Sequence, residues 1–288
     1  TACRRILEAK YKLGLFSNPY RYCNTKRNKT DIYSAENRQI ARDVAAETFV
    51  LLKNEGNLLP LKKQGKIALI GPLADTRNNI AGTWSVAQAP EKYTTIKEAM
   101  KKALDGKATL LYAQGSNIWR NRELQKNGEQ GKSIAWGDEE KMKNEALQIA
   151  KEADVIVCAM GETADMSGEC ASRTNLEMPD VQQELLAELA KTGKPVILLN
   201  FAGRPTVLSW ENEHIPAIMN VWFGGSEVGD ALCDVIFGDK VPSGKLTTSM
   251  PKTTGQEPLY YNHQNTGRPV PDLSLIHISE PTRRRGIS

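Results

Sequence analysis

Three carboxylate side chains gather in one short stretch of the sequence, directly after an apolar run. The run Val155–Met160 is short, uncharged and rich in β-branched residues, which predicts a buried strand. Glu162, Asp165 and Glu169 follow it in a loop that begins with Gly161. Ligands of open α/β sheets bind beside the carboxyl ends of the strands. We therefore expect these carboxylates to lie where a proton can be exchanged with a bound ligand.

Glu162 and Glu169 are the candidates for proton transfer within this loop. A general acid must hold its proton near neutral pH, so burial or a nearby negative charge must raise its pKa. Glu162 follows the strand end directly, where a hydrogen-bonding role in the loop is the alternative interpretation. Glu169 follows Gly168, which permits a bend and allows the loop to close over a ligand. The positions of the residues leave both candidates open.

The elements that must position this loop alternate between strands and helices. Short apolar runs predict strands at 67–70, 109–112, 155–160, 195–199, 215–222 and 244–250. Apolar residues at helical spacing predict helices at 2–13, 34–54, 95–104, 138–153, 180–191 and 227–237. Polar stretches at 24–31 and 115–137 predict a linker and a long loop. Repeated strand–helix units indicate an α/β fold with a largely parallel sheet covered by helices on both faces.

The composition excludes several classes of protein. Hydrophobic residues make up 40% of the 288-residue chain and charged residues 25%, which is typical of a protein with a folded core. The net charge is only +4 and no basic stripe is present, so we expect no nucleic-acid partner. No apolar stretch approaches the roughly 20 residues of a transmembrane helix, so we expect no membrane span.

The sequence also lacks the motifs that hold cofactors and metals. Gly224 and Gly225 precede a predicted helix, but neither a dinucleotide-binding nor a phosphate-loop pattern is present, so we expect a tight turn and no cofactor. His214 and His263 have no partners at ligand spacing, so we expect no metal. The five cysteines are widely spaced and odd in number, which predicts buried free thiols.

The last sixteen residues, 273–288, resemble the in-frame translation of a sequencing adapter. We therefore expect a non-native tail that took no part in the selection of the fold. Without this tail the net charge falls to +2, which weakens the case for an acidic partner further. The alternative is an ordinary basic C-terminal tail.

Several segments, in collinear order, resemble glycoside hydrolase family 3, in particular its bacterial periplasmic-type β-glucosidases. They are residues 5–16, 50–61, 67–72, 167–173, 200–205, 222–227, 237–245 and 261–269. The resemblance implies a (β/α)₈-type barrel followed by an α/β sandwich. It also implies a retaining mechanism, in which a carboxylate of the barrel forms a covalent glycosyl-enzyme and a Glu of the sandwich domain serves as acid and base.

The resemblance divides the chain into four parts. Residues 1–16 match the last helix of a truncated barrel, 17–33 form a linker, 34–272 form the α/β sandwich, and 273–288 are the non-native tail. Because the rest of the barrel is missing, the nucleophile is missing too. We expect the fragment alone to be inactive, with a β-linked sugar and its own barrel domain as its partners.

The resemblance also selects between the two candidate acids. Glu169 lies in Ser-Gly-Glu-x-x-x-Arg, the spacing that the family uses for its acid/base residue, so we assign that role to Glu169 and keep Glu162 as the alternative. Arg173 is then expected to anchor the loop through a carboxylate, and the residues that bind the substrate remain unassigned.

The function implied by the resemblance is that of an exo-acting β-glucosidase of carbohydrate metabolism. Its location would be periplasmic or secreted. The alternatives are a β-xylosidase or another β-glycosidase of the family. A non-catalytic carbohydrate-binding or scaffold domain is the alternative from a different class, and a nucleotide-binding module is disfavoured because the phosphate loop is missing.

Overall fold

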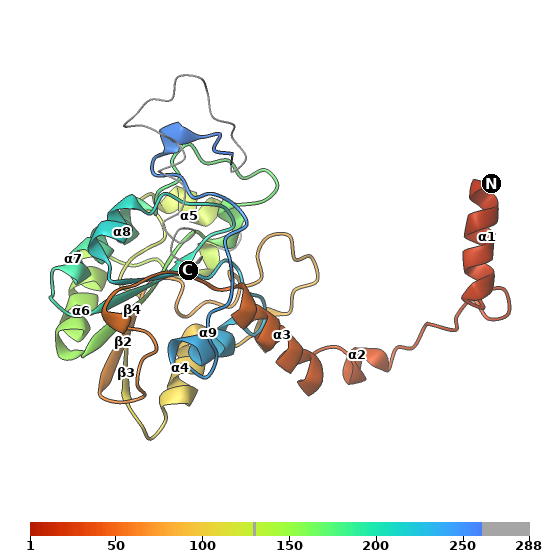
Figure 1. The fold of residues 1–288 in the computed structure, drawn as a ribbon, viewed down its shortest axis with the longest axis horizontal. Helices are drawn as coiled ribbons and strands as arrows, with labels where there is room; N and C mark the ends of the chain where they lie inside the picture. Colours follow the sequence, from red (N-terminus) through yellow and green to blue (C-terminus); the bar gives the residue numbers. More distant parts are fainter. Residues whose placement is uncertain (129–130, 261–288) are drawn as a thin grey trace, which may run out of the picture. The chain divides into compact units, whose positions relative to one another are not determined.

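The structure is a computed structural model that describes residues 1–128 and 131–260 (Figure 1). The chain divides into two compact units, Thr1–Ile40 and Ala41–Ser288. The segment 261–269, His263 and the tail 273–288 lie outside the described residues. No helix in the described part of the chain is both long enough and apolar enough to cross a bilayer.

The first unit begins with the helix α1, Ala2–Lys12, which confirms the helix predicted there. The chain turns at Gly14 with a φ of +70°, a conformation that glycine adopts without strain. None of the residues of α1 is buried, although Ile6, Leu7 and Tyr11 are apolar or aromatic. The predicted linker contains one short helix, α2, Arg27–Thr30.

The second unit is built on a six-stranded sheet with the order β1-β6-β5-β4-β2-β3. All neighbouring strands are parallel except β1, which pairs antiparallel with β6. The strands are β1 Val50–Asn54, β2 Lys66–Ile70, β3 Thr109–Ala113, β4 Val155–Gly161, β5 Val196–Phe201 and β6 Ala217–Asn220. This sheet confirms the predicted largely parallel α/β fold.

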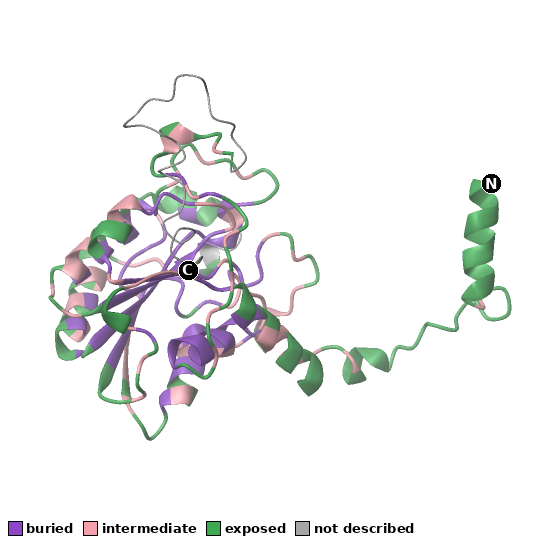
Figure 2. Cartoon of the chain, viewed as in Figure 1, coloured by how far each residue is buried: buried purple, intermediate pink, exposed green. Residues whose placement is uncertain are grey.

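Helices cover both faces of the sheet (Figure 1). The helices from Ala35 onward are α3 Ala35–Thr48, α4 Ile96–Leu104, α5 Arg122–Asn127, α6 Glu139–Glu152, α7 Asp180–Ala190, α8 Ser209–His214 and α9 Val228–Ile236. Apolar residues of α6 and α7 pack on one face, and α4 and α9 pack together on the other. Every residue of β4 and β5 is buried (Figure 2). The central strands therefore give the loops at their carboxyl ends a rigid base.

Three predicted elements are wrong. The helix predicted to reach Asn54 ends at Thr48, because the following residues pair with β6 as strand β1. No strand forms at 244–250, where Gly244 donates one backbone hydrogen bond to Phe49 but no ladder follows. The predicted long loop at 115–137 contains the helix α5, whose start Asn121 caps by accepting from the backbone N–H of Glu123.

The prediction of buried thiols is correct for only two of the five cysteines. Cys158 and Cys233 are buried, whereas Cys3, Cys23 and Cys170 are exposed, and all five are free. The two buried thiols lie on β4 and α9, where they serve as small apolar core residues.

Candidate active site

The candidate loop starts where β4 ends, at a close approach between two strands. Gly161 has a φ of +126°, and a Cβ at this position would lie 2.2 Å from the carbonyl oxygen of Phe201 on β5. Gln182 of α7 accepts from the Gly161 N–H over 2.9 Å and donates to its carbonyl over 3.0 Å. The backbone N–H of Glu162 then donates to the Phe201 carbonyl over 2.8 Å. These contacts fix the backbone from which the Glu162 side chain projects.

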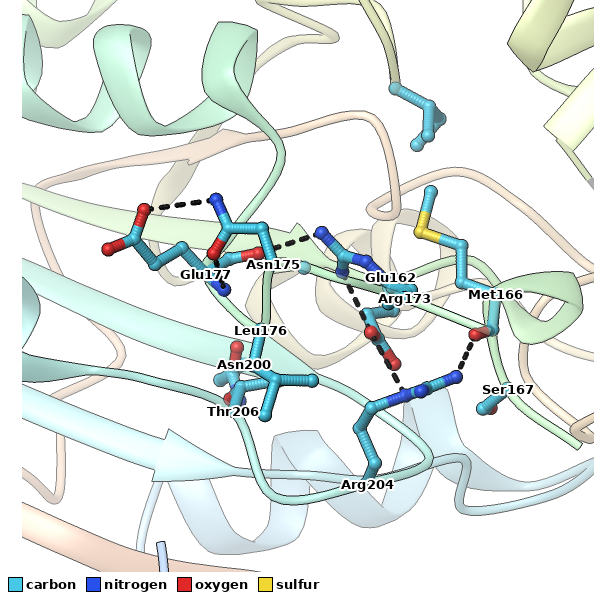
Figure 3. Close-up of polar contacts among 12 residues, drawn as sticks. Glu162, Met166, Ser167, Arg173, Asn175, Leu176, Glu177, Asn200, Arg204 and Thr206 are labelled. Carbon is cyan, nitrogen blue, oxygen red and sulfur yellow. Dashed lines mark hydrogen bonds and ion pairs between the residues drawn. The ribbon is translucent and has the colours of Figure 1, made fainter. Parts of the chain in front are cut away.

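The Glu162 carboxylate lies between two guanidinium groups (Figure 3). Only 1% of the side chain is exposed, and its Oε1 lies 2.8 Å from Nη1 of Arg173 and 3.3 Å from Nε of Arg204. Its Oε2 has no hydrogen-bond partner among the described residues. One buried negative charge therefore faces two positive charges, and its removal would leave both without a counter-ion.

The segment that leads from Glu162 toward Glu169 is held mainly through its backbone. Asn79 accepts from the N–H of Ala164 over 3.1 Å, and Arg204 donates to the carbonyl of Met166. Thr83 donates to the carbonyl of Ser167 over 2.7 Å. Side chains from two other loops, those after β2 and β5, therefore fix the course of the chain up to the residue before Gly168.

The returning segment of the loop is held by Arg173. Its Nη2 donates to the carbonyl of Glu177 over 2.9 Å, while its Nη1 contacts Glu162. Its guanidinium also lies over the Trp119 ring, 5.3 Å from the centroid. With 9% of its side chain exposed, Arg173 is fixed on several sides.

Glu169 stands at the turn between these two segments and is exposed to solvent. It makes no hydrogen bond or ion pair with any residue that the structure describes. Gly168 precedes it with a φ of +100°, and Cys170 follows with a φ of +59°. The structure thus brings Glu162 and Arg173 together, and the exposed Glu169 contacts neither of them.

A hollow of about 900 Å³ lies along one flank of the loop. Its lining includes Trp119, Asp165, Cys170 and Arg173. Arg120 also lines it, held by ion pairs of 2.6 to 3.2 Å to three carboxylates, those of Glu139, Asp180 and Glu184. The described residues contain no group of three or more side chains placed to hold a metal ion.

Arg204 is the site residue that the sequence analysis missed. It follows β5, the strand next to β4 in the sheet, so its loop emerges at the same edge as the candidate loop. An arginine directly after a strand neighbouring the carboxylates was the available signal, because the carboxyl ends of parallel strands meet at one edge.

Comparison with known proteins places these features in a family. The sequence profile described as "Glycosyl hydrolase family 3 C-terminal domain" matches residues 49–279. The chain is 42% identical to a "Periplasmic beta-glucosidase" of Salmonella typhimurium over 93% of the chain and 36% of that protein. It is 36% identical to a "Beta-xylosidase" of Formosa agariphila over 90% of the chain and 34% of that protein.

A solved structure shows the same similarity. The crystal structure of a β-glucosidase from Listeria innocua in complex with glucose matches with a TM-score of 0.77 and 34% sequence identity. The match covers 93% of this chain and 34% of that one. The chain therefore spans about a third of the length of the relatives that it matches.

Proposed function

The chain belongs to glycosyl hydrolase family 3, and from this membership we propose that it supplies the acid/base carboxyl group of a retaining β-glycosidase. We assign that group to Glu169. The observation that supports the assignment is the contrast within the loop: Glu162 is buried and paired with arginines, whereas Glu169 is exposed, unpaired and presented at a turn whose two flanking segments are fixed.

The proposed reaction has two steps. A carboxylate of a barrel domain attacks the anomeric carbon while the Glu169 carboxyl group gives its proton to the departing glycosidic oxygen, which leaves as an alcohol. The Glu169 carboxylate then takes a proton from water as the water oxygen attacks the same carbon and releases the sugar. Retention requires the two carboxyl groups to stand about 5–5.5 Å apart, so the barrel must bring its carboxylate to the exposed tip of this loop.

A β-glucoside is the substrate that we propose, with removal of single sugars from a chain end. Support comes from the Salmonella relative, named a periplasmic β-glucosidase, and from the Listeria structure with bound glucose. The name of the Salmonella relative also supports a periplasmic location. A β-xyloside is the second candidate, supported by the Formosa relative. Measuring kcat/KM for both glycosides on the parent protein, the longer enzyme to which we assign this chain, separates the two.

The test of the acid/base assignment is Glu169→Ala in the parent protein. Its rate on alkyl β-glucosides, whose leaving groups require a proton, should fall by about 10²–10⁴-fold. Added azide should restore part of the rate on activated aryl glucosides and yield a β-glucosyl azide, because azide attacks the glycosyl-enzyme without help from a base. Glu177→Ala is the matched control, since Glu177 is an exposed acid of the same loop.

Two results would contradict the assignment. One is an unchanged rate for Glu169→Ala on alkyl glucosides. The other is a folded Glu162→Ala protein that loses activity and responds to azide, which would transfer the role to Glu162. If neither the replacement of Glu162 nor that of Glu169 changes the dependence of the rate on the leaving group, the domain is a carbohydrate-binding or scaffold domain without a catalytic role.

A further inference from the structure

We propose that Arg204 is a positioning residue for the acid/base loop: it ties the leading segment of the loop to buried Glu162 and so determines where Glu169 meets the glycosidic oxygen. This inference rests on the proposed role of Glu169. It concerns a different loop, the one after β5, which also donates the backbone N–H of Val207 to the Leu176 carbonyl over 3.0 Å.

The Arg204 side chain bridges two fixed points. Its Nε lies 3.3 Å from Oε1 of Glu162, and its Nη2 donates to the carbonyl of Met166, three residues before Glu169 (Figure 3). About a fifth of the side chain is exposed, so the contact is largely shielded from water. The guanidinium therefore holds the backbone just before Glu169 in a fixed place relative to Glu162, which directly follows β4.

The returning segment of the loop is bound to the same oxygen atom, Oε1 of Glu162. Arg173, four residues after Glu169, donates to Oε1 of Glu162 over 2.8 Å. Both segments that flank Glu169 are thus tied to one carboxylate, whose own backbone is bonded to β5. These two ties, together with the hydrogen bond from Thr83 to the Ser167 carbonyl, locate the tip of the loop, since the Glu169 side chain makes no described contact of its own.

The loop that carries Arg204 is itself well fixed. Asn200, at the end of β5, donates to Oγ1 of Thr206 over 3.2 Å and to Oδ1 of Asn220 over 2.8 Å. Asn200 and Asn220 are both buried. Arg204 therefore projects from a short connection that is held on either side, as a positioning residue requires.

Arg204 can be replaced without leaving the buried carboxylate of Glu162 unpaired. Without Arg204, Glu162 still has Arg173 as a buried counter-ion, so no unpaired charge remains in the interior. What is lost is the tie to the Met166 carbonyl. The substitution Arg204→Met, which retains an apolar stem of similar length, should therefore loosen the leading segment, which Asn79 and Thr83 still hold, while the fold persists.

Proton transfer is sensitive to such loosening. A general acid works at about 2.6–3.2 Å from the atom that it protonates, and a misplacement of about 1 Å can cost about 10²-fold in rate. Substrates with good leaving groups need no proton at that oxygen. Loss of positioning therefore has a signature that differs from general damage: poor leaving groups suffer and good ones do not.

The experiment compares Arg204→Met and unmodified parent protein on an alkyl β-glucoside and on a dinitrophenyl β-glucoside. The kcat/KM on the alkyl glucoside should fall by about 10–100-fold, with little change on the dinitrophenyl glucoside. Arg204→Lys keeps a charge beside Glu162 but cannot bridge to Met166, so it should show the same pattern. It also provides the test if the methionine variant does not fold. Arg77→Met, which removes an arginine that likewise joins a backbone carbonyl, that of Tyr93, to a carboxylate, that of Glu98, is the matched control and should leave the ratio unchanged.

A second experiment distinguishes a failure of this inference from a failure of the proposed function. In a Glu169→Ala background, Arg204→Met should add little, because the group that it positions is already absent. Equal losses on both substrates, or additive losses in the double variant, would overturn the positioning role. If Glu169→Ala itself leaves the leaving-group dependence unchanged, the proposed function fails. If Glu169→Ala alters that dependence and Arg204→Met and Arg204→Lys do not, only the present inference fails.

Discussion

Arg173 donates to Glu162 over 2.8 Å, and this buried pair joins the end of β4 to the segment that returns from Glu169. The pairing also determines where the positive charge of Arg173 lies. A guanidinium beside a general acid favours its ionised form and weakens it as a proton donor. Glu162 holds the positive charge of Arg173 at the base of the loop, whereas Glu169, the acid that we propose, lies at its tip.

Replacement of the buried carboxylate should cost far more than replacement of an exposed one. Glu162→Gln removes the counter-ion of two guanidinium groups, so we expect the free energy of unfolding to fall by about 3–5 kcal/mol. Urea unfolding of the 288-residue chain measures the loss. Glu184→Gln, which removes one exposed partner of Arg120, should cost at most about 0.5–1 kcal/mol. Similar losses for both variants would contradict the structural role of Glu162.

The glycine at the end of β4 should tolerate no side chain. In Gly161→Ala the new Cβ would lie 2.2 Å from the Phe201 carbonyl oxygen, in a backbone conformation with φ of +126°. Overpacking and backbone strain together should destabilise the chain by about 3 kcal/mol or more. Gly193→Ala is the matched control, because its φ is also positive, at +73°, but open space surrounds its Cβ position. It should cost about 1–2 kcal/mol from strain alone, and thermal unfolding of both variants provides the comparison.

A buried carboxyl group on α8 should make stability depend on pH. Only 2% of Glu211 is exposed, and burial, helped by the negative charge of Glu177, raises its pKa to about 7. A hydrogen bond from the backbone of Glu211 itself, a hydrogen bond from Gln183 and the charge of His214 oppose the rise in pKa. The unfolded chain releases this proton near the ordinary pKa of 4.5, so between pH 4.5 and 7 the folded chain binds more protons. This contribution to stability is complete below pH 4.5 and lost as the pH rises through 7.

The expected size is a fall in unfolding free energy of up to about 3 kcal/mol across that interval. Urea unfolding at about pH 5 and about pH 8 measures the change in the free energy of unfolding. The other titratable groups also contribute to this change, so variants are needed to isolate the part due to Glu211. In Glu211→Gln this part of the pH dependence should disappear. Glu213→Gln changes an exposed acid on the same helix and should retain it. An unaltered slope in the Glu211 variant would show that another group is responsible.

The central strands could be predicted from the sequence because the signal for them is local. The apolar runs that became β2, β4 and β5 are bounded by polar or glycine residues and carry their own pattern. The signal for β1 is different: Leu51 and Leu52 continue the apolar spacing of the preceding helix, and their strand conformation depends on pairing with β6, far along the chain. Tertiary pairing there outweighs local preference.

The same distinction applies to the candidate site. Glu162 could be placed at the edge of the sheet because it directly follows β4, and Glu169 could be placed in the loop that continues from that edge. Which of them is buried could not be predicted, because that depends on Arg204, which reaches Glu162 from the next strand's loop. Hydrogen bonds to the Met166 and Ser167 carbonyls likewise come from distant loops. Such contacts leave no periodic trace in the sequence.

The attachment of the loop through backbone carbonyls has a consequence for protein engineering. Arg204 and Thr83 bind the carbonyls of Met166 and Ser167, and every amino acid offers that group. The side chains at positions 171, 172 and 174, which line the hollow beside the loop, make no described hydrogen bond. A library randomised at these three positions should therefore retain its fold across most of its members. Directed evolution can search there for new leaving-group preferences without first repairing the scaffold.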